Sequence, residues 1–228
     1  MNAFNSRKFK WLAIIIVDLL LAVVIVGLLF IREERQETLI LSDLGVSLFP
    51  QSKIIEPFSL TDQKGAAFTE AGLQGQWSLI FFGFSNCPNV CPLTLRELAA
   101  AQAQLLASRS EPVPQIIFAT VDPARDDPAR LRRYLDGFPG ELVGLTGADA
   151  ELAKLAAQLY VVASKSSGHG DESTHASHAS SGDNEDQAGF DHSGHVSVIN
   201  PAGELVAAVA LPHRAENIIA ALSRLDSQ

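Results

Sequence analysis

The chain has 228 residues, enough for one domain of ordinary size plus an appendage. Hydrophobic residues make up 47% and charged residues 19%, which excludes an intrinsically disordered protein. The formal net charge of −9 argues against a nucleic-acid-binding protein, which needs a basic face to neutralise phosphates. Met1 is the only methionine, so a soft-metal site in this chain must use its two cysteines rather than a cluster of thioethers.

The first predicted element is a membrane-spanning helix over residues 11–31, a run that is apolar except for Asp18. At about 1.5 Å per residue its length matches the roughly 30 Å hydrocarbon core of a bilayer. The alternative is a cleaved signal peptide, but the run is longer than the usual apolar core of about 7–15 residues. No small-residue cleavage site follows it either, which favours an anchor that stays attached.

The charges that flank this span predict its orientation. Arg7, Lys8 and Lys10 precede it, whereas Arg32 and Arg35 follow it. This small basic excess points the N-terminus to the cytoplasm. No Arg- and Ser-rich presequence precedes the span, which favours a bacterial inner membrane over a mitochondrial one. We therefore expect a single-pass protein whose large domain lies in the periplasm.

Three segments follow from this pattern: a tail and anchor at residues 1–34, a stalk at residues 35–56 and one domain at residues 57–228. Strands are predicted from Phe58 and at 77–84, 115–121, 142–145, 196–199 and 204–209, and helices at 92–106, 127–138, 148–161 and 214–225. A β-α-β half followed by a hairpin and a helix is the order of the thioredoxin-like α/β fold, a central mixed sheet flanked by helices. Periodicity alone leaves other α/β folds open.

Residues 164–190 interrupt this alternation with a stretch rich in Ser, Gly, Asp and His that has almost no apolar side chains. Such a segment cannot pack a core and is predicted to be a mobile loop. Its histidines are His169, His175 and His178, and His195 follows shortly after. Two interpretations stay open: a solvated linker with incidental histidines, or an auxiliary low-affinity site for copper or zinc.

The cysteines, Cys87 and Cys91, lie where the predicted strand 77–84 gives way to the predicted helix 92–106. The unpaired N–H groups and partial positive charge of a helix N-terminus lower a thiol pKa and stabilise the thiolate. The spacing places the two sulfurs about one turn apart, close enough to chelate one metal ion or to close a disulfide. Soft thiolates select Cu(I) and also bind Zn, but two sulfurs leave Zn two ligands short.

Two purely structural interpretations of this cysteine pair, a stabilising disulfide and inert core cysteines, are weaker than a functional one. A disulfide across so small a loop restrains little chain entropy. Two inert core cysteines are unusual at a junction between a strand and a helix. Metal binding and thiol redox chemistry use the same two residues, and both stay open.

The segment around the cysteines, FFGFSNCPNVCPLTL at residues 81–95, resembles the signature of the SCO/SenC family, the membrane-tethered copper proteins of cytochrome oxidase assembly. Further landmarks agree in order and spacing: VDPARD at residues 121–126, LVGLTG at residues 142–147, and Asp191-His192-Ser193 ahead of Pro201. The resemblance covers about residues 57–225. It implies the thioredoxin-like fold and a bound copper ion.

The metal ligands that the resemblance implies are Cys87, Cys91 and His192. Imidazole suits copper in either oxidation state, so this set is expected to hold Cu(II) as well as Cu(I). Asp191 is a candidate partner of the ligands, and Asp122 with Arg125 is expected to brace a nearby loop. His195 is a rival third ligand, although the spacing to Pro201 selects His192.

Two positions depart from the family pattern: Asn86 and Asn89 stand where its members commonly carry His and Asp. The missing negative charge beside the site predicts weaker Cu(II) binding than is typical of the family. The His-rich insertion before Asp191 is a second departure.

The resemblance implies a copper-delivery protein without catalytic turnover, whose partner is a copper-receiving cytochrome c oxidase subunit. Other periplasmic copper chaperones and thioredoxin-like reductants are further candidate partners. The alternative function is a thiol–disulfide oxidoreductase that reduces the copper-binding cysteines of an oxidase subunit or another extracytoplasmic target. A thioredoxin would carry Cys-x-x-Cys, whereas this chain has three intervening residues. A peroxiredoxin-like peroxidase is disfavoured because residues 83–91 lack a Thr/Ser-x-x-Cys site.

Overall fold

The computed structural model describes residues 16, 19–28, 40–108, 112–165, 190–192 and 194–227. The chain divides into two compact units, Met1–Asp43 and Leu44–Gln228. In the first unit, residues 19–28 are helical. No helix within the described part of the chain is both long enough and apolar enough to cross a bilayer. The anchor at residues 11–31, which is only partly described, stays a prediction.

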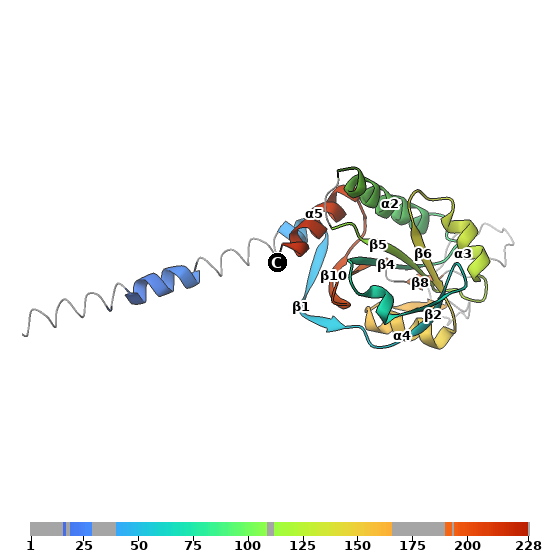
Figure 1. Ribbon diagram of the computed structural model, residues 1–228, viewed down its shortest axis with the longest axis horizontal. Helices are drawn as coiled ribbons and strands as arrows, with labels where there is room; N and C mark the ends of the chain where they lie inside the picture. The colour runs from blue at the N-terminus through green and yellow to red at the C-terminus, as the bar shows by residue number, and fades with distance from the viewer. Residues whose placement is uncertain are drawn as a thin grey trace, which may run out of the picture. The chain divides into compact units, whose positions relative to one another are not determined.

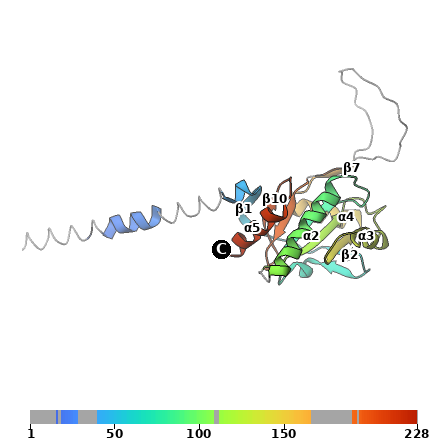
Figure 2. The ribbon, with the colours of Figure 1, turned by 90° about the horizontal axis from the view of Figure 1, so that it is seen from above.

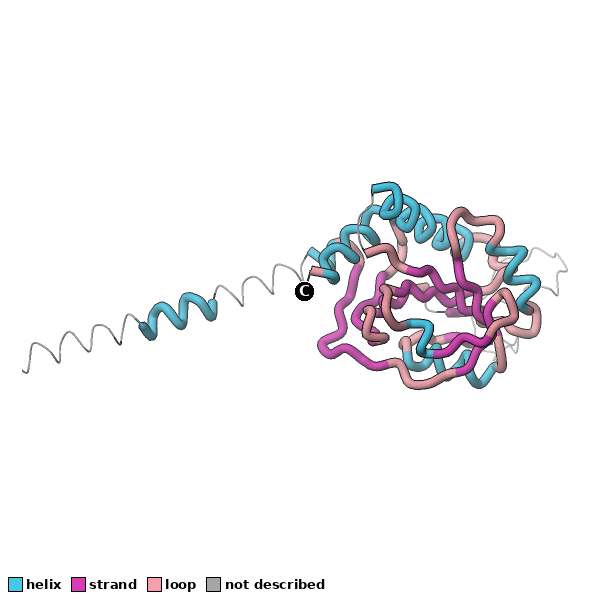
Figure 3. The backbone as a smooth tube through the Cα atoms, viewed as in Figure 1, coloured by secondary structure: helices cyan, strands magenta, loops and turns pink. Residues whose placement is uncertain are grey.

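The second unit is built on a mixed sheet (Figures 1 and 3). Its strands are β1 (Val46–Ile54), β2 (Ser59–Asp62), β3 (Ala67–Thr69), β4 (Ser78–Gly83), β5 (Gln115–Thr120), β6 (Leu142–Thr146), β9 (Val196–Ile199) and β10 (Glu204–Val209). They are arranged in the order β1-β10-β9-β4-β5-β6-β2-β3. A separate two-stranded sheet pairs β7 (Ala163–Lys165) with β8 (Phe190–His192). The fold thus contains one large sheet and one small one.

Strands β4, β5 and β6 in the middle of the large sheet are parallel and almost entirely buried. Every residue of β4 is buried, and β4 pairs in parallel with β5, from Ser78 opposite Gln115 to Gly83 opposite Thr120. β5 continues in parallel with β6, while β9 runs antiparallel on the other side of β4. Continuous apolar strands are expected where helices cover both faces of a sheet.

Helices cover both faces of this sheet. They are α2 (Val90–Ser108), α3 (Pro128–Leu135), α4 (Asp149–Gln158) and α5 (Ala215–Asp226), with a short 3-10 helix η1 (Glu70–Leu73). α2 and α5 lie side by side over one face, as Figures 1 and 2 show. On the opposite face, Leu152 and Leu155 of α4 pack with Phe82 and Ile117 in the core. α3 packs on β6, where Leu131 and Leu135 lie against Gly144, on the face opposite to α4.

The mixed sheet flanked by helices confirms the predicted α/β fold, and the hairpin has its predicted bounds. Other features differ from the sequence-based expectation, including β3 and η1, which the sequence did not predict. Val46–Ile54, inside the expected stalk, is the edge strand β1 and pairs with β10. Its alternation is obscured by Pro50, which an edge strand tolerates, and by an irregular register between Leu48 and Lys53. The ends of the expected loop form β7 and β8, which are too short to produce a periodic signal.

Candidate metal centre

The two cysteines lie in the connection that joins β4 to α2. β4 ends at Gly83 and α2 begins at Val90, so Cys91 stands in the first turn of the helix and Cys87 in the loop before it. The backbone N–H of Cys91 donates to the Cys87 sulfur at 3.5 Å. Both cysteines are free thiols. The Cys87 sulfur therefore takes the place of a capping acceptor at the helix N-terminus.

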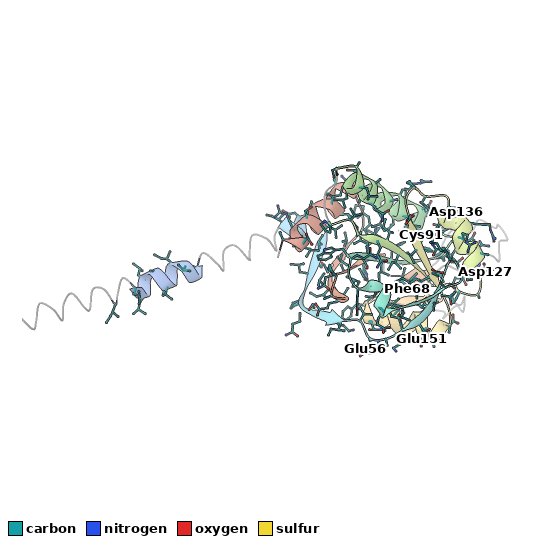
Figure 4. The ribbon with its side chains drawn as sticks, in the orientation of Figure 1. Glu56, Phe68, Cys91, Asp127, Asp136 and Glu151 are labelled. Atoms are coloured by element: carbon teal, nitrogen blue, oxygen red, sulfur yellow. The ribbon has the colours of Figure 1, made fainter. Side chains whose placement is uncertain are left out.

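Cys91, labelled in Figure 4, is fully buried (0% exposed) on the side of the sheet that α2 covers. Gly83 makes room for it, because a Cβ atom there would lie 2.8 Å from the Cys91 sulfur and 2.7 Å from the Phe118 ring. Burial raises the pKa of the Cys91 thiol, and its hydrogen bond with Cys87 raises the pKa further. For Cys91, the lowering of the thiol pKa expected at a helix N-terminus is therefore not the net result. The cost of taking a thiolate out of water outweighs the effect of the helix.

The other thiol is closer to solvent. Cys87 is half-buried, while the neighbouring Asn86 and Asn89 are exposed. Val90 and Leu93, on the first turn of α2, are also exposed, at 38% and 59%. Cys87 is therefore the thiol of the pair that solvent can reach, and Cys91 lies beneath it in the protein.

A buried carboxylate, Asp126, holds the beginning of the cysteine loop. Its Oδ2 accepts hydrogen bonds from the Ser85 backbone N–H at 2.9 Å and from the Thr120 hydroxyl at 2.7 Å. Its Oδ1 accepts from the Ser85 hydroxyl at 2.5 Å and lies 3.5 Å from Nε of Arg130. A buried charge requires such pairing and hydrogen bonding. Because Ser85 lies just before Cys87, this network fixes the backbone from which the metal-binding loop departs.

Asp122, expected to support the site, is engaged next to this network. Its carboxylate pairs with Arg125 at 2.6 Å. Its backbone carbonyl accepts from the N–H groups of Arg125 and Asp126, so Asp122 shapes the turn that presents Asp126. Sequence reasoning missed the direct contact of Asp126 with the cysteine loop. The available signal was its position in the segment 121–126 that carries the family resemblance.

The predicted histidine ligand lies on the small sheet. β8 ends at His192, which is opposite Ala163 of β7, and Asp191 is opposite Ser164. The side chains of Asp191 and His192 are not among those described, so their roles stay predictions. The auxiliary histidines fall outside the described residues: His169, His175 and His178.

The rival ligand, His195, has a different partner. Its Nε2 lies 3.1 Å from the Leu159 carbonyl oxygen at the end of α4, which occupies one ring nitrogen. Among the described side chains, which include Cys87, Cys91 and His195, no three His, Cys, Asp or Glu groups form a metal-binding cluster. His195 therefore does not complete a three-ligand site with the cysteines in this structure.

The last histidine, His213, is buried, with 7% of its area exposed. Its Nδ1 lies 3.0 Å from the Thr94 hydroxyl of α2, and its Nε2 lies 3.2 Å from the Val209 carbonyl. Burial lowers the pKa of His213. This histidine joins α2, the helix that carries Cys91, to the connection between β10 and α5, so its role is structural.

Comparisons with known proteins match most of the chain. The sequence matches the SCO1/SenC family over residues 48–226. A Stutzerimonas stutzeri protein is 30% identical over 182 residues, which cover 78% of this chain and 80% of that protein. "Protein SCO2 homolog, mitochondrial" of Mus musculus is 44% identical over 96 residues, 42% of this chain and 38% of that relative, so this match spans well under half of the mouse protein.

Solved structures support the same assignment. The structure of Bradyrhizobium japonicum ScoI with copper bound is similar to this chain, with a TM-score of 0.58 and 33% sequence identity. The similarity covers 75% of this chain and 98% of that one. Since the family match extends over most of the sequence, the chain belongs to the SCO1/SenC family.

Proposed function

We propose that this protein is a membrane-anchored copper-binding protein that holds copper through Cys87, Cys91 and His192 and delivers it during assembly of a cytochrome c oxidase. The observation that carries the proposal is the free cysteine pair at the start of α2, with Cys87 in hydrogen-bond contact with Cys91. The similar ScoI of Bradyrhizobium japonicum has been solved with copper bound.

The two thiols suit copper as a cargo. Thiolate is a soft ligand that selects Cu(I), and the pair is already close together on a braced loop. Binding releases the thiol protons, so the buried and protonated Cys91 becomes a thiolate only when a cation compensates its charge. Cys87 lies nearer the solvent, which gives an incoming or outgoing copper ion a thiol to contact first.

His192 is the proposed third ligand. It ends β8 on the small sheet, and its spacing to Pro201 matches the family pattern. The engagement of His195 Nε2 with the Leu159 carbonyl further favours His192 over its rival. Imidazole coordinates Cu(II) well, so we expect His192 to matter more for Cu(II) than for Cu(I).

The location and partner belong to the same proposal. A span at residues 11–31 would anchor the chain in the bacterial inner membrane, with the domain in the periplasm. The proposed recipient is a copper-binding subunit of the oxidase. The exposed side chains beside the cysteines, Val90 and Leu93, offer apolar area for a passing partner.

A second candidate function is reduction of a disulfide in such a partner. The specific observation is that the solvent-accessible Cys87 and the buried Cys91 are both reduced and in hydrogen-bond contact. The Cys87 thiolate would attack the target disulfide, and Cys91 would then displace the target thiol. Two electrons and two protons would pass to the target, leaving a Cys87–Cys91 disulfide.

Titration of the detergent-solubilised full chain with Cu(I) and Cu(II) under anaerobic conditions tests the proposal. We expect one tightly bound equivalent of copper, and we expect His192→Ala to lose more than tenfold in Cu(II) affinity because a ligand is removed. His195→Ala is the matched control and should keep wild-type affinity. Two results together would instead support the reductase. The wild-type chain would bind no copper tightly, and it would exchange disulfides rapidly at a rate that His192→Ala does not change.

A further inference from the structure

Tyr134, on α3, has a buried hydroxyl group without a hydrogen-bond partner. Of the described side chains, only Tyr134 and Ser197 carry such a buried and unpaired oxygen. Leaving a buried donor unpaired costs about 1–3 kcal/mol, so the rest of the molecule must offset this cost. A hydrogen-bond partner that is present only in another state of the protein would remove this cost in that state.

The position of Tyr134 near the cysteine pair indicates that this other state is the copper-bound one. Its ring packs against Phe118 of β5, with 5.6 Å between ring centroids. The same Phe118 ring lies beside Gly83, next to the point where the Cys91 sulfur approaches the sheet. Tyr134 and the cysteine pair therefore lie on one side of the sheet, which α2 and α3 cover.

The electrostatic surroundings of Tyr134 also indicate that it lies near the cysteine pair. Burial raises the pKa of Tyr134, and the nearby acidic groups Cys91, Cys87 and Asp126 raise it further. Arg96 offsets part of this effect. The phenol therefore stays protonated at neutral pH and keeps an O–H group to donate, in the field of the two sulfurs.

We propose that Tyr134 is a positioning residue of the copper site, whose O–H donates a hydrogen bond to a thiolate of the Cys87–Cys91 pair when copper is bound. The inference rests on the proposed copper function. A neutral thiol is a weak acceptor, so the hydroxyl gains a good partner only after copper displaces the thiol proton. A hydrogen bond to a ligating sulfur withdraws electron density from it, which favours Cu(I) over Cu(II).

The test is Tyr134→Phe in the detergent-solubilised full chain, which removes the hydroxyl and keeps the ring. Tyr160→Phe is the matched control, because Tyr160 is the other tyrosine and is 57% exposed. We expect Tyr134→Phe to lower the ratio of Cu(I) to Cu(II) affinity roughly tenfold, the size of one charge-assisted hydrogen bond. The sulfur-to-Cu(II) charge-transfer absorption should shift as well, while Tyr160→Phe changes neither property.

A second measurement separates this role from a purely structural one. In the metal-free chain the hydroxyl has no bond to lose, so Tyr134→Phe should not decrease resistance to urea unfolding. A clear loss of metal-free stability would overturn the proposal, as would an unchanged affinity ratio in a chain that still binds copper. A wild-type chain that binds no copper would overturn the proposed function itself and this inference with it.

Discussion

The two parts of the proposed copper site are held by the fold in different ways. The loop with Cys87 and Cys91 follows the central strand β4 and is tied to the buried Asp126 by hydrogen bonds. His192 lies on β8, which pairs with β7 over only three residue positions and is not part of the large sheet. Short two-stranded sheets are marginally stable on their own.

This difference bears on how copper is taken up and released. The thiols are preorganised before copper arrives, so binding Cu(I) requires little rearrangement of the cysteine loop. The histidine side depends on a small separate sheet, and we expect this sheet to open at a lower free-energy cost than the large one. We therefore expect damage to the cysteine side to affect both folding and copper affinity, and changes near the histidine side to leave folding intact.

The largest expected effect comes from Asp126→Ala. This change leaves the Ser85 and Thr120 donors and the Arg130 charge without their buried acceptor, which should cost roughly 3 kcal/mol of unfolding free energy. Copper affinity should decrease as well, because Ser85 no longer fixes the cysteine loop. Urea unfolding and copper titration measure the two effects.

The adjacent Asp127 supplies the control. Its side chain is exposed and caps α3 by accepting from the Arg130 backbone N–H at 2.6 Å. Asp127→Ala should cost about 1 kcal/mol and leave copper affinity unchanged. Equal losses of copper affinity in both variants would show that Asp126 has no special role in holding the loop.

Gly83→Ala tests the packing of Cys91 directly. The new methyl group would lie 2.8 Å from the Cys91 sulfur, so the helix N-terminus or the sulfur must move, at a cost of about 1–3 kcal/mol. Gly144→Ala is the matched control, since its methyl group would meet Leu135 at 2.6 Å on the same face of the sheet. Both variants should be destabilised, but only Gly83→Ala should weaken Cu(I) binding in a competition titration.

The buried His213 predicts a dependence of stability on pH. The pKa of His213 is lowered in the folded protein from its usual value of 6.5. Below about pH 6.5 the unfolded chain therefore takes up a proton on this histidine more readily than the folded protein does. The neutral side chain therefore contributes its full stability above about pH 6.5, and this contribution is lost as the pH decreases towards the folded pKa. The nearby charges act in opposite directions: Glu97 raises this pKa and His195 lowers it.

Urea unfolding at pH 7.5 and at more acidic pH checks this prediction. The free energy of unfolding should decrease on acidification in the wild-type chain and decrease less in His213→Gln. A decrease of the same size in His213→Gln would assign the acid sensitivity to other groups.

The smallest expected effect is that of deleting residues 166–186. The deletion removes three histidines, His169, His175 and His178, and leaves both strands of the small sheet. If these histidines form an auxiliary site, weak copper or zinc equivalents should disappear while the tightly bound equivalent keeps its affinity. If the deletion instead abolished binding of the tightly bound copper ion, the result would show that the position of His192 depends on the whole insertion.

The sequence by itself determined the central strands, the main helices and the position of the cysteine pair. The apolar run that becomes β4 and the leucine pattern of α2 are local signals, and they place Cys87 and Cys91 at a helix start without any knowledge of tertiary contacts. The stretch at 196–209 predicts its hairpin in the same way, from Pro and Gly between two apolar segments.

Only the tertiary structure decided how the site is supported. Ser85 and Asp126 are 41 positions apart, and Thr94 and His213 are 119 apart, so no local pattern predicts that they meet. The raised pKa of Cys91 likewise depends on burial against Gly83 and Phe118, which overrides the local effect of the helix N-terminus. Local periodicity fixes elements, whereas burial and long-range hydrogen bonds depend on how those elements pack together.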